Sequence, residues 1–496
     1  MPIPALEQLT RKTREEVIKE VSKGAPRWFP WRDIHIDPDK TTVSFAIPEV
    51  ERTSGGEISY VRDLRIHGMR GIEALEVTLP SPGHKEGQWM ILLGENGAGK
   101  TTILRAIALA LASEKLAVAL HARSSEDAPF IRRGNKSSSI EIGLSKGRAT
   151  ATINTSKKTE TLQKSFAGMQ AGLPIFGYGS QRGSATGGPD RAVSMDRLGG
   201  LATLFDSSAS LIHAETWLVQ LAGVAAEGRK ADKDLFEAVK ATLAKLLPRG
   251  DEIITVERGR AVVRIGKEDV PFAGLSDGYL TTLGWTIDLI ARWSHQRRRT
   301  AQVNPESFAS DMRCIVLVDE LDLHLHPRWQ CDIVDKLRQA FPSTTFIATT
   351  HNPLTLHGTR PGEVYVVRRT DDGALDVLQR DLPAGIRADQ ILTGDWFGLT
   401  TTVDADTQRL LEQHRQLLLA GRDEHDAERR QLEAELRSRL GRFAETSVER
   451  LAQGVAAEIL DETTPITAKE RARVKAVVRE RLRTSALRVA KRRSSS

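Results

Sequence analysis

Cysteine is scarce in this chain, and long apolar runs are missing from it. Only Cys314 and Cys331 are present among 496 residues, which argues against a disulfide framework and favours a reducing, cytoplasmic compartment. No stretch approaches the roughly 18–20 continuous apolar residues of a membrane span. The N-terminal residues lack the apolar core of a signal peptide. We therefore expect a globular cytoplasmic protein with no membrane partner.

Charge of one sign is only mildly in excess. The formal net charge is +6 and the sequence pI is about 9.2, which is compatible with a DNA partner but does not identify one. Charged residues make up 27% of the chain and hydrophobic residues 40%, as in soluble globular proteins. The length favours two to four domains.

A glycine-rich segment carries the first chemical motif. Residues 94–101 read G-E-N-G-A-G-K-T and fit G-x-x-x-x-G-K-[ST], the P-loop that cradles nucleotide phosphates. A strand predicted over residues 88–93 and a helix predicted over 101–112 supply the context that this loop requires. Lys100 is expected to reach the β- and γ-phosphates of ATP, and the Thr101 hydroxyl is expected to ligate Mg²⁺. The predicted nucleotide-binding residues here are Gly94, Glu95, Asn96, Gly97, Ala98, Gly99, Lys100, Thr101 and Thr102.

Two consecutive carboxylates follow an apolar, β-branched run. Residues 315–318 read I-V-L-V and precede Asp319 and Glu320, as in a buried strand that ends at a magnesium site. Asp319 is expected to bind Mg²⁺ directly or through water. Glu320 is expected to take a proton from the attacking water and is therefore a catalytic candidate. The alternative is an acidic strand end with no catalytic role.

Residues 275–279 read L-S-D-G-Y and precede a predicted helix. Ser276 and Gly278 would offer a hydroxyl, a backbone N–H and a helix N-terminus, and these groups suit a γ-phosphate presented by another copy. An ordinary N-cap serine is the alternative. Ser276, Asp277 and Gly278 are thus candidates for completing a neighbour's site, which predicts a homo-oligomer of at least two copies.

The order of these motifs resembles the ABC-type AAA-family ATPase heads of the RecF, SMC and OLD groups, over about residues 58–370. The resemblance implies that Gln181 is the Q-loop residue that senses Mg²⁺ and the γ-phosphate. It also implies that Asp322 lies in the D-loop and that His351 is the catalytic switch histidine. Residues 69–71 read M-R-G where the family has F-R-G, so Arg70 is a further candidate for nucleotide binding.

The resemblance implies an α/β fold: an ABC-type P-loop ATPase head with an antiparallel β lobe and a helical lobe, plus a helical C-terminal extension. Alternating polar and apolar residues over 138–165 predict the antiparallel strands, and residues 207–247 are expected to be mostly helical. Residues 252–265 are expected to form a hairpin that leads to the L-S-D-G-Y segment. We expect an N-terminal helix and irregular arm over residues 1–57. The ATPase domain would span 58–400, with its helical lobe at about 200–300, and a basic helical domain would span 401–496.

Residues 388–392 and 396–399, with the charged helix that follows, are similar to PtuA-type ATPases of Septu and retron antiphage systems. In these systems the ATPase associates with an HNH nuclease, and this chain shows no nuclease pattern of its own. The resemblance implies an ATPase subunit of a defence complex that regulates a partner HNH nuclease. Two alternatives stay open: a stand-alone RecF-like DNA repair ATPase, and an ATP-bound structural scaffold.

Two charged clusters outside these motifs are also open to more than one interpretation. His324 and His326 have metal-like chemistry, but no cysteine or carboxylate cluster completes a ligand set, so a structural role is favoured. Residues 469–493 contain eleven Lys or Arg and two Glu. This basic segment is interpreted as a DNA contact, as a docking helix for a partner, or as a solvated helix.

Overall fold

The computed structural model divides into two compact units, residues 1–398 and 399–496, which are described separately. The predicted helix near the N-terminus and the basic segment 469–493 lie outside the described residues. The structure describes residues 34–36, 43–45, 60–83, 86–125, 129–156, 159–168, 174–182, 199–228, 230–249, 252–297, 304–370, 374–383, 385–399, 401–419 and 426–440.

A six-stranded sheet forms the centre of the first unit, in the order β16-β15-β5-β14-β13-β9. Its strands run parallel except β16, which pairs antiparallel with β15. Every residue of the central strand β5 is buried. Trp89, Ile91 and Leu93 pack into one core, whereas Met90 and Leu92 pack into a second core on the other face. The bounds are β5 (Trp89–Leu93), β9 (Ile175–Tyr178), β13 (Ile315–Val318), β14 (Thr345–Thr350), β15 (Val364–Arg369) and β16 (Leu375–Gln379).

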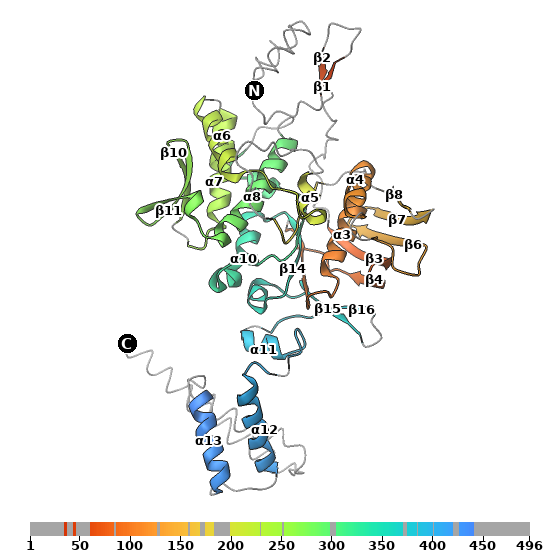
Figure 1. Ribbon diagram of the computed structural model, residues 1–496. Coiled ribbons are helices and arrows are strands. Elements are labelled where there is room, and N and C mark those ends of the chain that lie inside the picture. Colours follow the sequence, from red (N-terminus) through yellow and green to blue (C-terminus); the bar gives the residue numbers. More distant parts are fainter. Residues whose placement is uncertain are drawn as a thin grey trace. The chain divides into compact units, whose positions relative to one another are not determined.

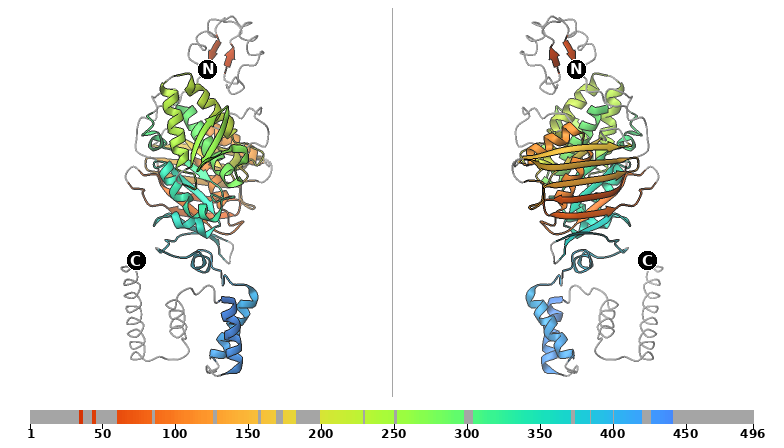
Figure 2. Two further views of the ribbon diagram at one scale, coloured as in Figure 1. Left: turned by 90° about the vertical axis from the view of Figure 1, so that its left-hand side faces the viewer. Right: turned by 90° about the vertical axis from the view of Figure 1, so that its right-hand side faces the viewer.

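A five-stranded antiparallel sheet covers one side of this unit, in the order β4-β3-β6-β7-β8, and it faces the viewer on the right of Figure 2. Helix α3 (Lys100–Leu111) contacts strands of both sheets, so the second core lies around it. Helix α4 (Glu114–Ser125) packs beside β8. The strands are β3 (Val61–Met69), β4 (Ile72–Thr78), β6 (Ser137–Leu144), β7 (Arg148–Ser156) and β8 (Thr159–Ala167).

Lys164 of β8 joins this sheet to the far end of α3. Its ammonium group donates hydrogen bonds to the carbonyl oxygens of Leu109 at 2.6 Å and Ala110 at 2.7 Å, and also to that of Ala112. These carbonyls lie at the helix C-terminus, where they have no partner within the helix. Lys164 therefore caps α3.

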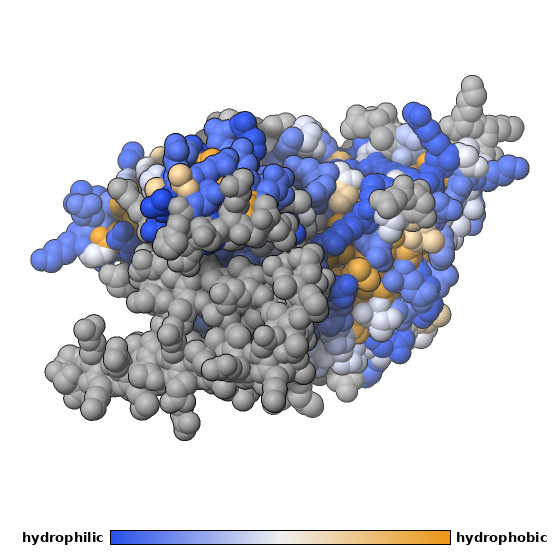
Figure 3. Space-filling view, turned by 90° about the horizontal axis from the view of Figure 1, so that it is seen from below, coloured by the Kyte–Doolittle hydropathy of each residue, from blue (hydrophilic) through white to orange (hydrophobic). Residues whose placement is uncertain are grey.

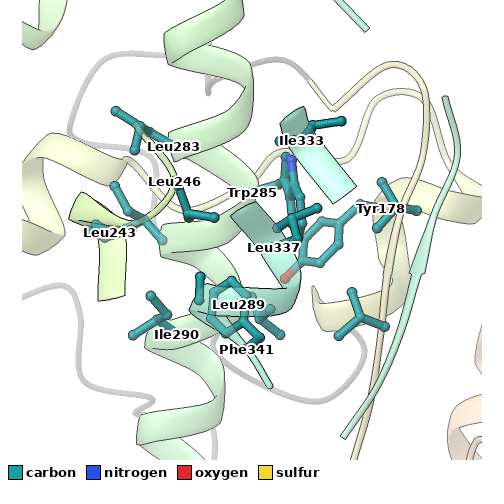
Figure 4. Packing of buried hydrophobic residues seen from close by; sticks show 14 of the residues in the cluster. Tyr178, Leu243, Leu246, Leu283, Trp285, Leu289, Ile290, Ile333, Leu337 and Phe341 are labelled. Atoms are coloured by element: carbon teal, nitrogen blue, oxygen red, sulfur yellow. The ribbon is translucent and has the colours of Figure 1, made fainter. Parts of the chain in front are cut away.

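The helical lobe lies on the opposite side of the central sheet, together with a three-stranded sheet (Figure 1). Its side chains build the first core, which Figure 4 shows around Trp285 and Tyr178. The elements are α6 (Ala214–Ala226), α7 (Lys230–Ala244), β10 (Ile253–Glu257), β11 (Arg260–Ile265), β12 (Glu268–Pro271), η2 (Phe272–Gly274), α8 (Asp277–Arg297), α9 (Phe308–Asp311), α10 (Pro327–Ala340), η3 (Pro353–Gly358) and α11 (Ala388–Thr393). Helix α5 (Gly199–Phe205) instead contacts α3 and α4 and adds side chains to the second core.

A buried polar cluster ties α8 to strand β9. The carboxylate of Asp288 accepts hydrogen bonds from the Tyr178 hydroxyl at 3.1 Å, from Arg292 Nε at 2.7 Å and from the Ile212 amide at 3.0 Å. Asp288 is fully buried, and a buried charge is tolerated when it is paired and hydrogen-bonded. Burial and the negative charge of Asp288 raise the pKa of Tyr178 well above its usual value. The Tyr178 hydroxyl therefore stays protonated and acts as a donor.

The second unit contains helices α12 (Ala405–Leu419) and α13 (Ala427–Leu440), which contact each other. Leu436 is buried, and Glu433 of α13 pairs with Arg429 and His414. No helix among the described residues of either unit has the length and apolar character needed to cross a bilayer. Hydrophilic residues dominate the described surface in Figure 3, with smaller apolar areas between them.

The predicted fold class is confirmed, and the predicted strands of the antiparallel lobe and the hairpin at residues 252–265 are present. Three details differ. The arm that was expected to be irregular holds a short antiparallel pair, β1 (Ile34–Ile36) and β2 (Val43–Phe45). Residues 207–213 are not helical, and α5 precedes them. Strand β12 adds to the predicted hairpin although three of its four residues are charged or proline.

Candidate nucleotide site

The P-loop connects β5 to α3 and carries two left-handed glycines. Gly97 has φ 80° and Gly99 has φ 103°, and this backbone conformation disfavours any side chain. A Cβ on Gly97 would meet nothing within 4 Å, whereas a Cβ on Gly94 would lie 2.4 Å from the Val367 carbonyl oxygen. The loop therefore packs on β15 at its base and is open above Gly97.

Lys100 lies at the first position of α3, and its side chain folds back over the loop. Its ammonium group donates to the carbonyl oxygens of Gly94 at 2.7 Å and Glu95 at 2.9 Å. Burial lowers the pKa of Lys100, and the negative charges of Asp319 and Glu320 oppose that shift. Thr102 is half-buried beside Thr101 in the first turn of α3.

Asp319 follows strand β13 and is 95% buried, with hydroxyl groups on both of its carboxylate oxygens. Thr101 Oγ1 donates to Asp319 Oδ2 at 2.7 Å, and Thr349 Oγ1 donates to Asp319 Oδ1 at 2.6 Å. The first of these hydrogen bonds joins residues 218 positions apart in the sequence. The fold thus places the P-loop threonine against the first of the two predicted carboxylates.

Glu320 has a left-handed backbone, with φ 50°. Its amide donates to Thr349 Oγ1 at 2.8 Å. Within the described part of the chain, its side-chain carboxylate forms no hydrogen bond, and the residue is half-exposed. A carboxylate that is free, partly exposed and adjacent to Asp319 has the properties expected of a general base.

The end of β9 lies beside the end of β13, because the two strands pair in parallel with Tyr178 opposite Val318. Gln181 is exposed just beyond β9. The next residue, Arg182, is 1% exposed and donates to the main-chain carbonyl oxygens of Asp319 and Glu320. Sequence reasoning identified Gln181 here but missed Arg182.

Two threonines at the end of β14 were also missed. Thr349 bridges Asp319 and the Glu320 amide. Thr350 Oγ1 donates to Asp322 Oδ1 at 2.6 Å and accepts from the Asn352 amide at 3.0 Å. His351 is exposed between Thr350 and Asn352. The predicted D-loop and switch-histidine segments are therefore joined through the Thr350 hydroxyl.

The signature segment begins α8. Ser276 and Asp277 are exposed, whereas Gly278 is buried, and a Cβ on Gly278 would lie 2.7 Å from the His324 carbonyl oxygen. No hydrogen bond among the described residues joins Ser276 to the P-loop or to Asp319. The signature segment thus leaves its hydroxyl and helix end accessible.

The positions of Arg70 and the two histidines are also defined. Arg70 lies over the Phe130 ring at 4.3 Å and donates to Ser124 Oγ at 3.4 Å. Burial and Arg105 lower the pKa of Arg70 to about 10. His326 Nδ1 accepts from the Arg328 amide and caps α10. His324 is exposed. Within the described ranges, no three or more His, Cys, Asp or Glu side chains are grouped so that they could hold a metal ion.

The residues fit ATP and Mg²⁺. The open backbone at Gly97 and the buried ammonium of Lys100 suit phosphate. The Thr101 hydroxyl and Asp319 carboxylate, 2.7 Å apart, are the hard oxygen donors that Mg²⁺ prefers, and Mg²⁺ is commonly held by one or two carboxylates together with waters and substrate phosphates. Thr101 and Asp319 would therefore hold the ion, and Lys100 with the loop amides would hold the phosphates.

Two protein-family models match the chain. The first, described as "AAA domain", covers residues 63–174, and the second, described as "AAA domain, putative AbiEii toxin, Type IV TA system", covers residues 220–357. The first match contains the P-loop, and the second contains the signature segment, both carboxylates and His351. The matched regions therefore include three of the segments that the fold brings to one edge of the sheet.

Curated relatives include Septu protein PtuA of Bacillus mycoides, which is 28% identical over 374 residues, or 73% of this chain and 48% of the relative. Septu protein PtuA of Bacillus thuringiensis is 22% identical over 65% of this chain and 79% of its own length. The Retron Vc95 probable ATPase of Vibrio cholerae is 38% identical over 22% of this chain and 20% of its own length. The chain spans about half the length of the first of these relatives.

Solved structures with a similar arrangement include the SMC head domain of Thermotoga maritima, at 13% identity and a TM-score of 0.36 over 65% of this chain and 99% of that chain. An SMC head bound to the C-terminal winged-helix domain of ScpA aligns at 16% identity and a TM-score of 0.39, over 65% and 98%. The motif order, the observed architecture and the AAA matches indicate an ABC-type AAA ATPase that is similar to PtuA.

Proposed function

We propose that this ABC-type AAA ATPase binds ATP with Mg²⁺ and hydrolyses it to ADP and phosphate. The observation that carries the proposal is the 2.7 Å hydrogen bond between Thr101 and Asp319, with the free carboxylate of Glu320 one residue away. The P-loop hydroxyl, the carboxylate proposed to bind the metal and the proposed general base lie at one end of the parallel sheet. Ligands of open α/β sheets typically bind at this carboxyl end of the strands.

Each residue has a distinct task in this proposal. The P-loop amides and Lys100 bind the phosphates, and Thr101 with Asp319 orients the metal. Mg²⁺, when bound, neutralises phosphate charge. The Glu320 carboxylate takes a proton from the water that attacks the γ-phosphate. His351 and Gln181 are proposed to contact the γ-phosphate and the metal's water shell from the ends of the two flanking strands.

We further propose that two copies complete each site. Ser276 and Asp277 are exposed at the start of a 21-residue helix, so the hydroxyl and the helix N-terminus are accessible to a phosphate held by a partner copy. Asp322 is proposed to lie at the same junction. The support is the accessibility of Ser276 together with its lack of a hydrogen bond to the described P-loop of its own chain.

We propose an antiphage defence role in which the ATPase regulates a separate HNH nuclease. The resemblance to PtuA-type ATPases and the Septu and retron names of the curated relatives support this role. We also propose a cytoplasmic location, because a chain with only two cysteines suits a reducing compartment. DNA contact by the basic segment 469–493 remains part of the proposal.

The ATPase proposal is tested with Glu320→Gln and Lys100→Ala in the full chain. The first variant should keep ATP binding, lose hydrolysis by roughly 10²–10⁴-fold, and accumulate as a dimer by mass measurement in ATP. The second should lose ATP affinity in calorimetry. Glu86→Gln, at an exposed ion pair with Arg360, is the matched control and should hydrolyse ATP normally. Wild-type turnover in Glu320→Gln would refute the assigned general base.

The nuclease proposal needs a separate experiment. An HNH nuclease encoded by a neighbouring gene is co-expressed with this chain. The mass of the purified sample is then compared with that of the ATPase alone. A stable complex supports the proposed partner. An unchanged mass, together with DNA-stimulated hydrolysis by the chain alone, would favour a stand-alone RecF-like ATPase.

A further inference from the structure

Arg182 is among the largest side chains that are almost completely buried, and it is 1% exposed. It follows β9 immediately after Gln181, and its partners lie after another strand. One terminal nitrogen, Nη1, donates to the carbonyl oxygen of Gly179 at 3.0 Å and to that of Asp319. The other, Nη2, donates to the carbonyl oxygen of Glu320 at 2.7 Å. The guanidinium group thus binds the main chain of both carboxylate residues and does not contact their carboxylate groups.

The backbone of Glu320 needs such support. A left-handed conformation at a residue with a side chain costs about 1–3 kcal/mol and persists only where the surroundings determine it. At Glu320, φ is 50°. The amide of Glu320 is held by Thr349 Oγ1, and the next amide, that of Leu321, donates to the Thr349 carbonyl oxygen at 2.9 Å. The Glu320 carbonyl oxygen accepts from the Leu323 amide at 3.1 Å and from Arg182 Nη2 at 2.7 Å, and Arg182 is the side chain that joins it to the Asp319 carbonyl oxygen.

The charge of Arg182 also matches its surroundings. Burial lowers the pKa of Arg182 to about 10, and the negative charges of Asp319, Glu320 and Asp322 oppose that shift. The guanidinium group is therefore protonated near neutral pH and keeps all its donors. A planar, always charged fork is the group best suited to hold several oxygens in a fixed arrangement.

We propose that Arg182 is a positioning residue for ATP hydrolysis. It fixes the main chain of Asp319 and Glu320 and thereby aims the Glu320 carboxylate at the attacking water. This inference rests on the proposed role of Glu320 as general base. Because none of its hydrogen bonds reaches the described P-loop, which would hold the phosphates, Arg182 acts on turnover and leaves the affinity for ATP measured without Mg²⁺ unchanged.

The test uses Arg182→Gln and Arg182→Lys in the full chain. Arg182→Gln removes the charge and the fork, and a displacement of about 1 Å in a catalytic group costs on the order of 10²-fold in rate. We expect kcat to fall by roughly 10–100-fold, with the Kd for ATP unchanged within about twofold in calorimetry without Mg²⁺. Arg182→Lys keeps one ammonium donor and should recover part of the rate. Arg338→Gln is the control, because Arg338 of α10 is an arginine with a 13% exposed side chain that pairs with Glu363, just before β15.

A double-mutant cycle with Glu320→Gln separates positioning from general folding. If Arg182 acts through Glu320, adding Arg182→Gln to Glu320→Gln leaves the residual turnover unchanged, because residues that act as a unit are non-additive. Full additivity would overturn the inference and leave the ATPase proposal intact. Wild-type turnover in Glu320→Gln would overturn both. An equal loss in Arg338→Gln, or failure of both Arg182 variants to fold while Arg338→Gln folds, would reduce Arg182 to a structural residue.

Discussion

Replacing Thr349 by valine should remove two hydrogen bonds at the centre of the site without changing side-chain shape. The hydroxyl donates to the Asp319 carboxylate and accepts from the Glu320 amide, and the residue is fully buried. A hydrogen bond to a charged group contributes about 1.5–3 kcal/mol, and a neutral one contributes about 0.5–1.5 kcal/mol. The free energy of unfolding should therefore fall by about 2–4 kcal/mol.

The structure offers a matched control in Thr355. This threonine is equally buried, and its hydroxyl has no hydrogen-bond partner among the described residues. Thr355→Val exchanges the same atoms but removes no hydrogen bond, so it should be neutral or stabilising. Thr349→Ser keeps the hydroxyl and should recover most of the stability that Thr349→Val removes.

The assay is thermal unfolding of the full chain without nucleotide, followed by circular dichroism. At roughly 2 °C per kcal/mol for a large domain, Thr349→Val should lower Tm by about 4–8 °C, and Thr355→Val should not lower it. Equal Tm shifts in the two valine variants would refute the reasoning, because the hydroxyl contacts of Thr349 would then contribute nothing.

Three further changes test other parts of the molecule. Ser276→Arg should abolish hydrolysis while leaving ATP binding in calorimetry unchanged, and mixing it with Lys100→Ala subunits should restore some activity; normal hydrolysis by Ser276→Arg alone would contradict shared sites. Burial lowers the pKa of Lys164 from 10.5 to about 7. Between these pH values the unfolded state binds one more proton than the folded state. The free energy of unfolding therefore rises with pH, by about 1.4 kcal/mol per pH unit. Urea unfolding at pH 7, 8 and 9 should show this rise in the wild type but not in Lys164→Met, and equal slopes would exclude it. If the basic segment contacts DNA, deleting residues 466–496 should flatten the salt dependence of DNA binding by roughly 0.9 log units per log salt for each phosphate that the segment neutralises. If it docks the nuclease, the deletion should abolish nuclease co-purification. If neither change occurs, the basic segment is a solvated helix.

The parts of the site that sequence could predict are those that a local motif encodes. The P-loop is recognisable because its glycines, Lys100 and Thr101 occur at fixed spacing within one short segment. Asp319 and Glu320 are recognisable because they directly follow an apolar run. The motif order indicated that the P-loop and Asp319 belong to one site. The structure adds the contact itself, a hydrogen bond between Thr101 and Asp319 across 218 positions. The roles of Ser276, Gln181 and His351 remain predictions.

Arg182 and the two threonines could not be predicted in the same way. Arg182 binds main-chain carbonyls, and these leave no pattern in the side chains of its partners. Thr349 and Thr350 lie in a strand where threonine is already expected for its β-propensity, so their hydrogen bonds were hidden. A charged residue four positions after a short buried strand and next to Gln181 was the one available signal for Arg182.

The fold differences have equally local causes. Strand β12, with the sequence E-D-V-P, lacks the alternation by which the antiparallel lobe was recognised, and it forms because β11 offers it a pairing edge. Helix α5 starts with two glycines, which disfavour a helix in isolation. It forms because Leu201 and Leu204 are buried in the second core. Tertiary contacts overrode local preference in both places.

Helix α3 has a mechanical consequence that follows from its two anchored ends. Its 12 residues span about 18 Å at 1.5 Å per residue, with the phosphate loop at one end and the Lys164 cap at the other. A helix that is held at both ends keeps its length when one end is displaced along its axis. If the loop moves when it binds nucleotide, as the proposed function implies, we expect the displacement to reach strand β8 through Lys164. The antiparallel sheet would then respond to the nucleotide although β8 lies a full helix length away.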